Sequence, residues 1–236
     1  MSTDLIAAFP AGGAGGTTVD TLRELAGRRG MAFAALTNAS STEVLGSGAW
    51  QEESAGELRR LADSTTARRV VLVGHCMGGL SAVRLAAGLG PGFGRPVGVL
   101  VVNTPCPDDL GRIPTMSGYT DAEIAETLRR DGFPEEVLED EDMLAEVADG
   151  LRRDAEVADR LAEWVSATGQ LETLHVLSTR GDRFIPPEQC AAWRHRVHGD
   201  FHLTITAGGH ALDAESAPAL ERALDGLLST VPAEPA

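Results

Sequence analysis

The stretch that decides the fold is VVLVGHCMGG, which spans Val70–Gly79. Its first four residues, Val70–Val73, are continuously apolar, which is typical of a strand buried on both faces of a parallel sheet. Gly74 and Gly78 then allow a sharp turn, and the segment Gly79–Gly88 has helical periodicity. The stretch therefore predicts a buried strand that turns directly into a helix, which is the building unit of parallel α/β sheets.

The same alternation of short apolar runs and helical segments continues on both sides of this stretch. The other predicted strands are Leu5–Phe9, Met31–Leu36, Val97–Val102, Leu174–Ser178 and Phe201–Thr206. The other predicted helices are Val19–Arg29, Glu53–Ser64, Pro187–Val197 and Ala217–Leu228. This pattern predicts one α/β domain over residues 1–236, with a mostly parallel sheet and helices on both faces.

One segment interrupts the alternation, because residues 119–169 contain helical signals and no strand signal. We expect helices from Asp121 to Arg130, after Pro134, over Glu141–Asp149 and over Arg152–Ala167. Together with the residues before it, this segment forms a predicted helical lid insertion over residues 112–169. Insertions of this kind often cover an active site. The insertion is acidic, which is compatible with either a solvated face or a functional charge pattern.

Composition excludes several classes of protein. The 236 residues contain 20 basic and 35 acidic side chains, for a formal charge of −15, which argues against a nucleic-acid-binding protein. Every basic residue is Arg, so the chain cannot form a lysine Schiff base and carries no Gly-Lys-Ser/Thr phosphate loop. The cysteines Cys76, Cys106 and Cys190 are too few and too widely spaced to indicate a disulfide framework or a structural zinc site.

The chain has no signal-peptide pattern at its N-terminus and no apolar run near the ~20 residues needed to cross a bilayer. We therefore expect a cytoplasmic protein with no membrane contact.

The turn after the predicted strand Val70–Val73 has the pattern Gly-x-Cys-x-Gly, a nucleophile elbow with Cys76 at its centre. Gly74 and Gly78 remove side chains that would collide at such a turn. The thiol would lie at the positive end of the following helix, where a thiolate is favoured, and the amide of Met77 would face an oxyanion. The alternative is a buried structural cysteine in a glycine-rich turn.

A nucleophile needs a base and the base needs an orienting acid. His210 and Asp182 occupy loops directly after the last two predicted strands, so both should meet Cys76 at the carboxyl edge of the sheet. We expect His75 to point elsewhere along the turn. We also expect His175 and His202 to be structural, and His195 and His198 to be exposed near a helix end.

A second oxyanion donor should come from the glycine-rich loop Phe9–Gly16, which follows the first predicted strand. A phosphate-cradling loop is the competing interpretation. We favour the oxyanion interpretation, with the amide of Ala11 as donor, because the chain is acidic and the Gly-Lys-Ser/Thr sequence is absent.

These motifs resemble those of type II thioesterases, the stand-alone α/β-hydrolase enzymes of polyketide and nonribosomal peptide assembly lines. The matching stretches are Phe9–Gly13, Gly74–Gly79, Arg112–Pro114, Leu151–Asp154, Gly181–Asp182 and Gly208–His210. The resemblance implies a single α/β-hydrolase domain and the release of acyl groups from the phosphopantetheine arm of acyl- or peptidyl-carrier proteins. It implies neither a metal nor an organic cofactor, and we expect a monomer.

The sequence departs from that family at Cys76, where the family has Ser, and at Leu36–Ser40, where it has Pro-Gly-Arg. A cysteine nucleophile would form a new thioester instead of an oxygen ester, so the acyl group would keep its transfer potential. An acyltransferase or cyclase is therefore the alternative function. Further alternatives are hydrolysis of a small ester or amide and a non-catalytic interaction protein on the same scaffold.

Overall fold

Six strands form one sheet in the computed structural model, which describes residues 3–13, 17–108, 116–130, 133–168, 170–212 and 216–231. The strands are β1 (Asp4–Phe9), β2 (Ala32–Ala35), β3 (Arg69–His75), β4 (Val97–Val102), β5 (Leu171–Thr179) and β6 (Val197–Thr206). Their order is β2-β1-β3-β4-β5-β6, and every pair of neighbours is parallel. The predicted parallel α/β sheet is therefore confirmed, with each strand close to its expected position.

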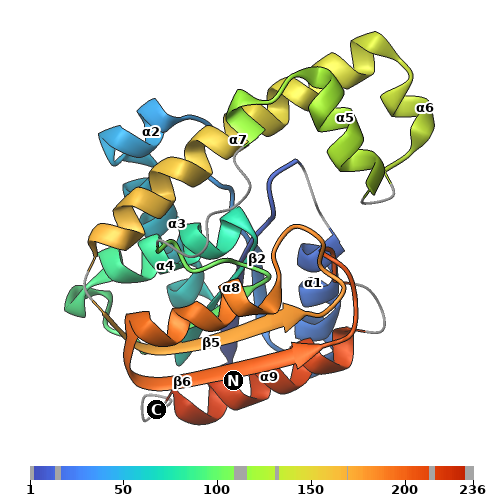
Figure 1. Ribbon diagram of the computed structural model, residues 1–236. Coiled ribbons are helices and arrows are strands. Elements are labelled where there is room, and N and C mark those ends of the chain that lie inside the picture. The colour runs from blue at the N-terminus through green and yellow to red at the C-terminus, as the bar shows by residue number, and fades with distance from the viewer. Residues whose placement is uncertain are drawn as a thin grey trace.

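Helices cover both faces of this sheet (Figure 1). The helices are α1 (Thr17–Arg29), α2 (Thr42–Ser47), α3 (Ala49–Ser64), α4 (Met77–Leu89), α5 (Asp121–Arg130), α6 (Glu135–Leu138), α7 (Glu141–Ala167), α8 (Pro187–Ala191) and α9 (Ala217–Thr230). One apolar cluster joins α1 and α9 to one face, through residues such as Leu22 and Leu224. The larger cluster joins α3, α4, α8 and part of α7 to the other face, through residues such as Leu58, Leu80 and Leu161.

The insertion is helical, as predicted, but it contains one long helix where two were expected. Helix α7 runs without a break through Gly150, so the prediction of separate helices over Glu141–Asp149 and Arg152–Ala167 is wrong. A glycine inside a helix costs only ~1 kcal/mol relative to alanine. Helix α7 packs against α5 and α6 in its first half and against α4 in its second half, and this packing offsets that cost.

The first half of α7 packs with α5 and α6 around Ile124, Leu128, Leu138 and Ala148, a small core separate from those of the sheet. The second half lies along α4 and contributes Leu161 to the main core. In Figure 1 the α5–α6 end of the lid extends away from the sheet, while the other end of α7 returns to it. The lid start at residues 112–115, including the Arg112–Pro114 motif, lies outside the described residues.

Two shorter elements also differ from the prediction. Helix α2 was not predicted; Ser41 caps it by accepting a hydrogen bond from the Val44 amide at 3.2 Å. The helix expected over Pro187–Val197 is divided into α8 and a 3₁₀ segment, Ala192–Arg196, and Val197 already belongs to β6. Among the described residues no helix is both long and apolar enough to cross a membrane.

Candidate active site

Cys76 lies between the last residue of β3 and the first residue of α4, in the sharp turn that the sequence predicted. Its backbone has φ 54° and ψ −120°, a strained conformation that costs of the order of 1–3 kcal/mol for a residue with a side chain. The turn requires glycine on both sides. A Cβ on Gly74 would lie 2.0 Å from the Gly78 carbonyl oxygen, and one on Gly78 would lie 2.4 Å from that of Pro10.

His210 and Asp182 form a direct pair at the same edge of the sheet. The Nδ1 atom of His210 lies 2.7 Å from Oδ2 of Asp182, whose side chain is fully buried. The other carboxylate oxygen, Oδ1, accepts hydrogen bonds from the amides of Phe184 and Ile185 at 2.8 and 2.9 Å. These two amides fix the carboxylate in place, and the carboxylate in turn holds one edge of the His210 imidazole.

The His210 ring also contacts Cys76, which completes a Cys–His–Asp arrangement. Burial disfavours the imidazolium form of His210, but hydrogen bonds to Asp182 and Cys76 outweigh burial and raise the pKa of His210 to about 10. At neutral pH the site therefore holds a positive charge beside the sulfur. An imidazolium in that position stabilises a thiolate, which is the reactive form of a cysteine nucleophile.

His75 has a larger part in the site than the sequence suggested. It is buried, and its Nε2 lies 2.9 Å from the carbonyl oxygen of His210. A carbonyl only accepts, so Nε2 carries the proton and Nδ1 accepts from the Thr18 hydroxyl at 3.0 Å. Burial, together with the nearby His210, lowers the pKa of His75 to about 3, so it stays neutral. His75 thus holds the loop that carries the proposed base.

Asn103 supports the same loop from the end of β4. Its Nδ2 donates to the His210 carbonyl oxygen at 2.7 Å, and its Oδ1 accepts from the Thr179 amide at 2.9 Å. Asn103 is itself buried with a positive φ of 42°. The sequence does not mark this residue, because a single Asn after a strand carries no distinctive pattern.

The two predicted oxyanion donors flank the elbow. Met77 opens α4 directly after Cys76, and Ala11 is buried in the loop after β1. Among the backbone hydrogen bonds between described residues, neither the Ala11 nor the Met77 amide donates. This loop approaches the elbow so closely that a Cβ added to Gly78 would collide with the Pro10 carbonyl oxygen. The end of the loop, residues 14–16, lies outside the described residues.

Asn38 fixes the orientation of the loop after β1, although nothing in its sequence context marks it for this role. Its Nδ2 donates to the Pro10 carbonyl oxygen at 2.9 Å, and its Oδ1 accepts from the Ser81 hydroxyl at 2.8 Å. From the lid, Asp154 accepts a hydrogen bond from the Gly13 amide at 2.6 Å. The loop that bears Ala11 is therefore held both from the loop after β2 and from α7.

The remaining titratable candidates lie elsewhere. Of the two histidines expected to be structural, His175 is buried but His202 is exposed, and their tilted rings have centroids 4.3 Å apart. His195 and His198 are exposed, as expected. Burial raises the pKa of the thiols of Cys106 and Cys190 to about 12 in each case. Among the described residues no three His, Cys, Asp or Glu side chains gather in a way that could hold a metal ion.

The fold and this site define a hydrolase of the α/β class. The profile of the Alpha/beta hydrolase family matches residues 10–224, and the chain belongs to that family. A search of curated proteins returned no match.

Solved structures with the same fold include several thioesterases. RedJ, a thioesterase from the prodiginine pathway of Streptomyces coelicolor, is 22% identical with a TM-score of 0.68, over 94% of this chain and 89% of its own. YbtT, a type II thioesterase from the yersiniabactin NRPS/PKS pathway, is 16% identical with a TM-score of 0.66, over 98% and 94%. Human thioesterase 2 is 18% identical with a TM-score of 0.65, over 97% of both chains.

Proposed function

We propose that this protein hydrolyses acyl thioesters through Cys76, His210 and Asp182. The observation that carries the proposal is the buried Asp182–His210 pair, with its 2.7 Å hydrogen bond, beside a cysteine on a strained strand-to-helix turn. A nucleophile, a base and an orienting acid are the groups that acyl transfer through a covalent intermediate requires.

The reaction begins when the Cys76 thiolate attacks the carbonyl carbon of the substrate thioester. The resulting oxyanion would be stabilised by the amides of Ala11 and Met77. As the tetrahedral intermediate collapses, the C–S bond to the substrate sulfur breaks and the imidazolium of His210 protonates the leaving thiolate. Water then attacks the acyl-enzyme with His210 as general base, which releases the carboxylic acid and restores Cys76.

The substrate class we propose is an acyl or peptidyl chain on the phosphopantetheine arm of a carrier protein. The support is the resemblance of the motifs around Cys76 and His210, together with structural neighbours such as YbtT, which comes from an NRPS/PKS pathway. The proposed steps use side chains and backbone amides alone and need no cofactor.

Acyl transfer is the second candidate, and the identity of Cys76 as a cysteine favours it. Attack by a thiol converts one thioester into another at little cost in free energy, whereas attack by a hydroxyl would give a more stable oxygen ester. The acyl-enzyme on Cys76 would therefore remain able to acylate an amine, a thiol or a hydroxyl in place of water.

Intact-mass spectrometry with a panel of acyl-carrier proteins tests both functions. We expect a transient mass increase equal to the acyl group on the wild-type chain and none on Cys76→Ala. Release of free acid indicates hydrolysis, and an adduct with an added acceptor indicates transfer. The same adduct on wild type and Cys76→Ala, or no adduct with any carrier, would contradict a Cys76 acyl-enzyme.

A further inference from the structure

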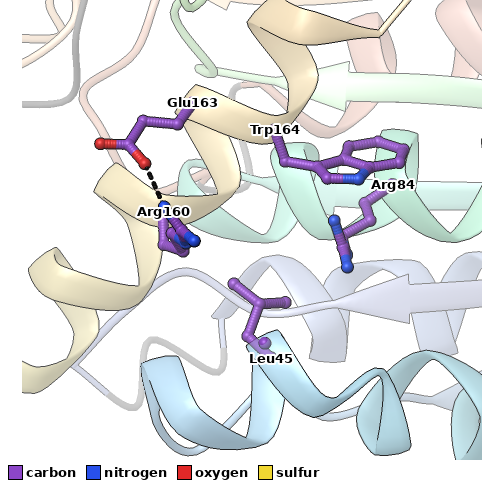
Figure 2. Close-up of a pocket in the computed structure, with 6 residues that line it drawn as sticks. Leu45, Arg84, Arg160, Glu163 and Trp164 are labelled. Atoms are coloured by element: carbon purple, nitrogen blue, oxygen red, sulfur yellow. Dashed lines mark hydrogen bonds and ion pairs between the residues drawn. The ribbon is translucent and has the colours of Figure 1, made fainter.

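A groove lies outside the Cys76 site, between α2, α4 and α7. Its lining residues are Leu45 and Gly46 of α2, Arg84 of α4, and Arg160, Glu163 and Trp164 of α7, and its volume is about 290 Å³. Figure 2 shows the Trp164 indole beside the Arg84 guanidinium, with Arg160 on the other side of the groove and Leu45 below. Two cations thus face one small space.

Arg84 is held by an aromatic ring and, among the described residues, has no anionic partner. Its guanidinium carbon lies 4.4 Å from the centroid of the Trp164 ring, within the range of a cation–π contact. Its Nε atom is buried and unpartnered, and no ion pair between described residues involves this side chain. Arg84 thus forms no ion pair with a described residue, and the groove lacks an anionic group that pairs with its guanidinium.

The charge around Arg84 points to the chemistry of that group. Burial and the positive charge of Arg160 both lower the pKa of Arg84. Arg160 is paired with Glu163 at 2.7 Å, and both of these side chains are more than half exposed at the rim. The groove therefore holds two guanidinium groups against one carboxylate, although the whole chain has a formal charge of −15.

We propose that this groove is a phosphate-binding subsite formed by Arg84 and Arg160. A planar guanidinium presents several N–H donors that match the oxygens of a phosphate, and a bound phosphate would pair with Arg84 and offset the repulsion between the two cations. The Trp164 ring keeps the Arg84 guanidinium in position for this contact.

We assign the phosphate to the phosphopantetheine arm of the substrate. This assignment rests on the proposed function. Arg84 is on the helix that begins after Cys76 and follows that residue by eight positions, about 12 Å along the helix axis. An extended arm whose thioester lay at Cys76 would place its phosphate at a distance from the sulfur, and titration with phosphopantetheine tests whether this groove receives it.

Calorimetric titration of the whole protein tests the subsite without turnover, so its result is independent of thioesterase activity. The probes are phosphopantetheine, pantetheine and inorganic phosphate. We expect Arg84→Met and Arg160→Met each to weaken binding of phosphopantetheine by about tenfold or more. Arg194→Met is the matched control, because it removes the same charge from another Arg–aromatic pair, 5.9 Å from the Phe201 centroid.

The outcomes separate the sources of the phosphate. Arg84-dependent binding that is tighter for phosphopantetheine than for inorganic phosphate supports the substrate arm. Equal Arg84-dependent binding of both supports the subsite but assigns it to free phosphate. Binding that is absent in the wild type, or that Arg194→Met weakens as much as Arg84→Met and Arg160→Met, overturns the subsite. Absence of thioester hydrolysis with Arg84-dependent phosphate binding intact would contradict the proposed function alone.

Discussion

Asn38 donates a hydrogen bond from its Nδ2 to the carbonyl oxygen of Pro10 at 2.9 Å, and this bond fixes the peptide that also carries the Ala11 amide. In a planar trans peptide the C=O and N–H groups point in opposite directions. Because the Pro10 carbonyl faces Asn38, the Ala11 N–H points away from Asn38. Ser81 in turn orients the Asn38 amide by donating to its Oδ1 at 2.8 Å.

Asn38→Asp should therefore lower kcat for thioester hydrolysis by about 10–100-fold, less than the ~10²–10³ that removal of one oxyanion donor costs. The carboxylate is nearly the same size but cannot donate to the Pro10 carbonyl, so the peptide loses its fixed orientation. KM should change little, because the substrate is bound before the oxyanion forms. Steady-state kinetics measure both constants, with thermal unfolding as the check on folding. A change confined to KM would show that Asn38 acts on substrate binding instead.

Iodoacetamide should label Cys76 faster than Cys106 or Cys190 at neutral pH. Burial raises the pKa of the thiols of Cys106 and Cys190 to about 12, so neither forms an appreciable thiolate. Cys76 is partly exposed and faces the imidazolium of His210. Peptide mass mapping over time gives the three rates, and His210→Ala should slow only that of Cys76. If Cys76 were labelled at an unchanged rate in His210→Ala, His210 would not activate the Cys76 thiol.

Gly78→Ala should destabilise the protein by about 1–3 kcal/mol and lower its activity. The added Cβ would lie 2.4 Å from the Pro10 carbonyl oxygen and 2.6 Å from that of Phe9, so the backbone of the loop must shift. Gly56→Ala in α3 is the matched control, because its Cβ would meet nothing within 4 Å. That variant should gain about 0.5–1 kcal/mol from helix propensity. Urea unfolding measures both, and equal effects would show that the loop does not press on the elbow.

Stability should fall steeply as the pH falls from about 6.5 to about 4. Burial, with a smaller effect of His202, lowers the pKa of His175 to about 4, and the pKa of His75 is lowered to about 3. In this window the unfolded chain binds protons that the folded chain excludes, so each histidine contributes a slope of about 1.4 kcal/mol per pH unit. His210 adds none, because its raised pKa keeps it protonated in both states below about 6.5.

His175→Gln should accordingly remove the share of this slope that His175 contributes, and the exposed His195 supplies the control variant His195→Gln. Urea unfolding at several pH values between 4 and 7 measures the slopes. If His175→Gln and wild type lost stability in parallel over this range, the folded pKa of His175 would not be lowered as stated.

The sequence by itself determined the six strands, most of the helices and the edge of the sheet at which the site forms. Continuous apolar runs specify buried parallel strands, and Gly74 and Gly78 specify the turn between β3 and α4, because both signals depend on neighbouring residues. Strands that all run the same way end at the same edge, so loops that follow β5 and β6 had to bring Asp182 and His210 near the elbow.

Only the tertiary structure decided how α7 continues through Gly150 and which side chains hold the site in place. The continuity of α7 depends on its packing against both the lid helices and α4, which outweighs the local cost of glycine. Asn38 reaches Pro10 from 28 positions away, and His75 reaches the His210 carbonyl across 135. Such contacts leave no periodic or local signal, because they exist only once distant segments of the chain have packed together.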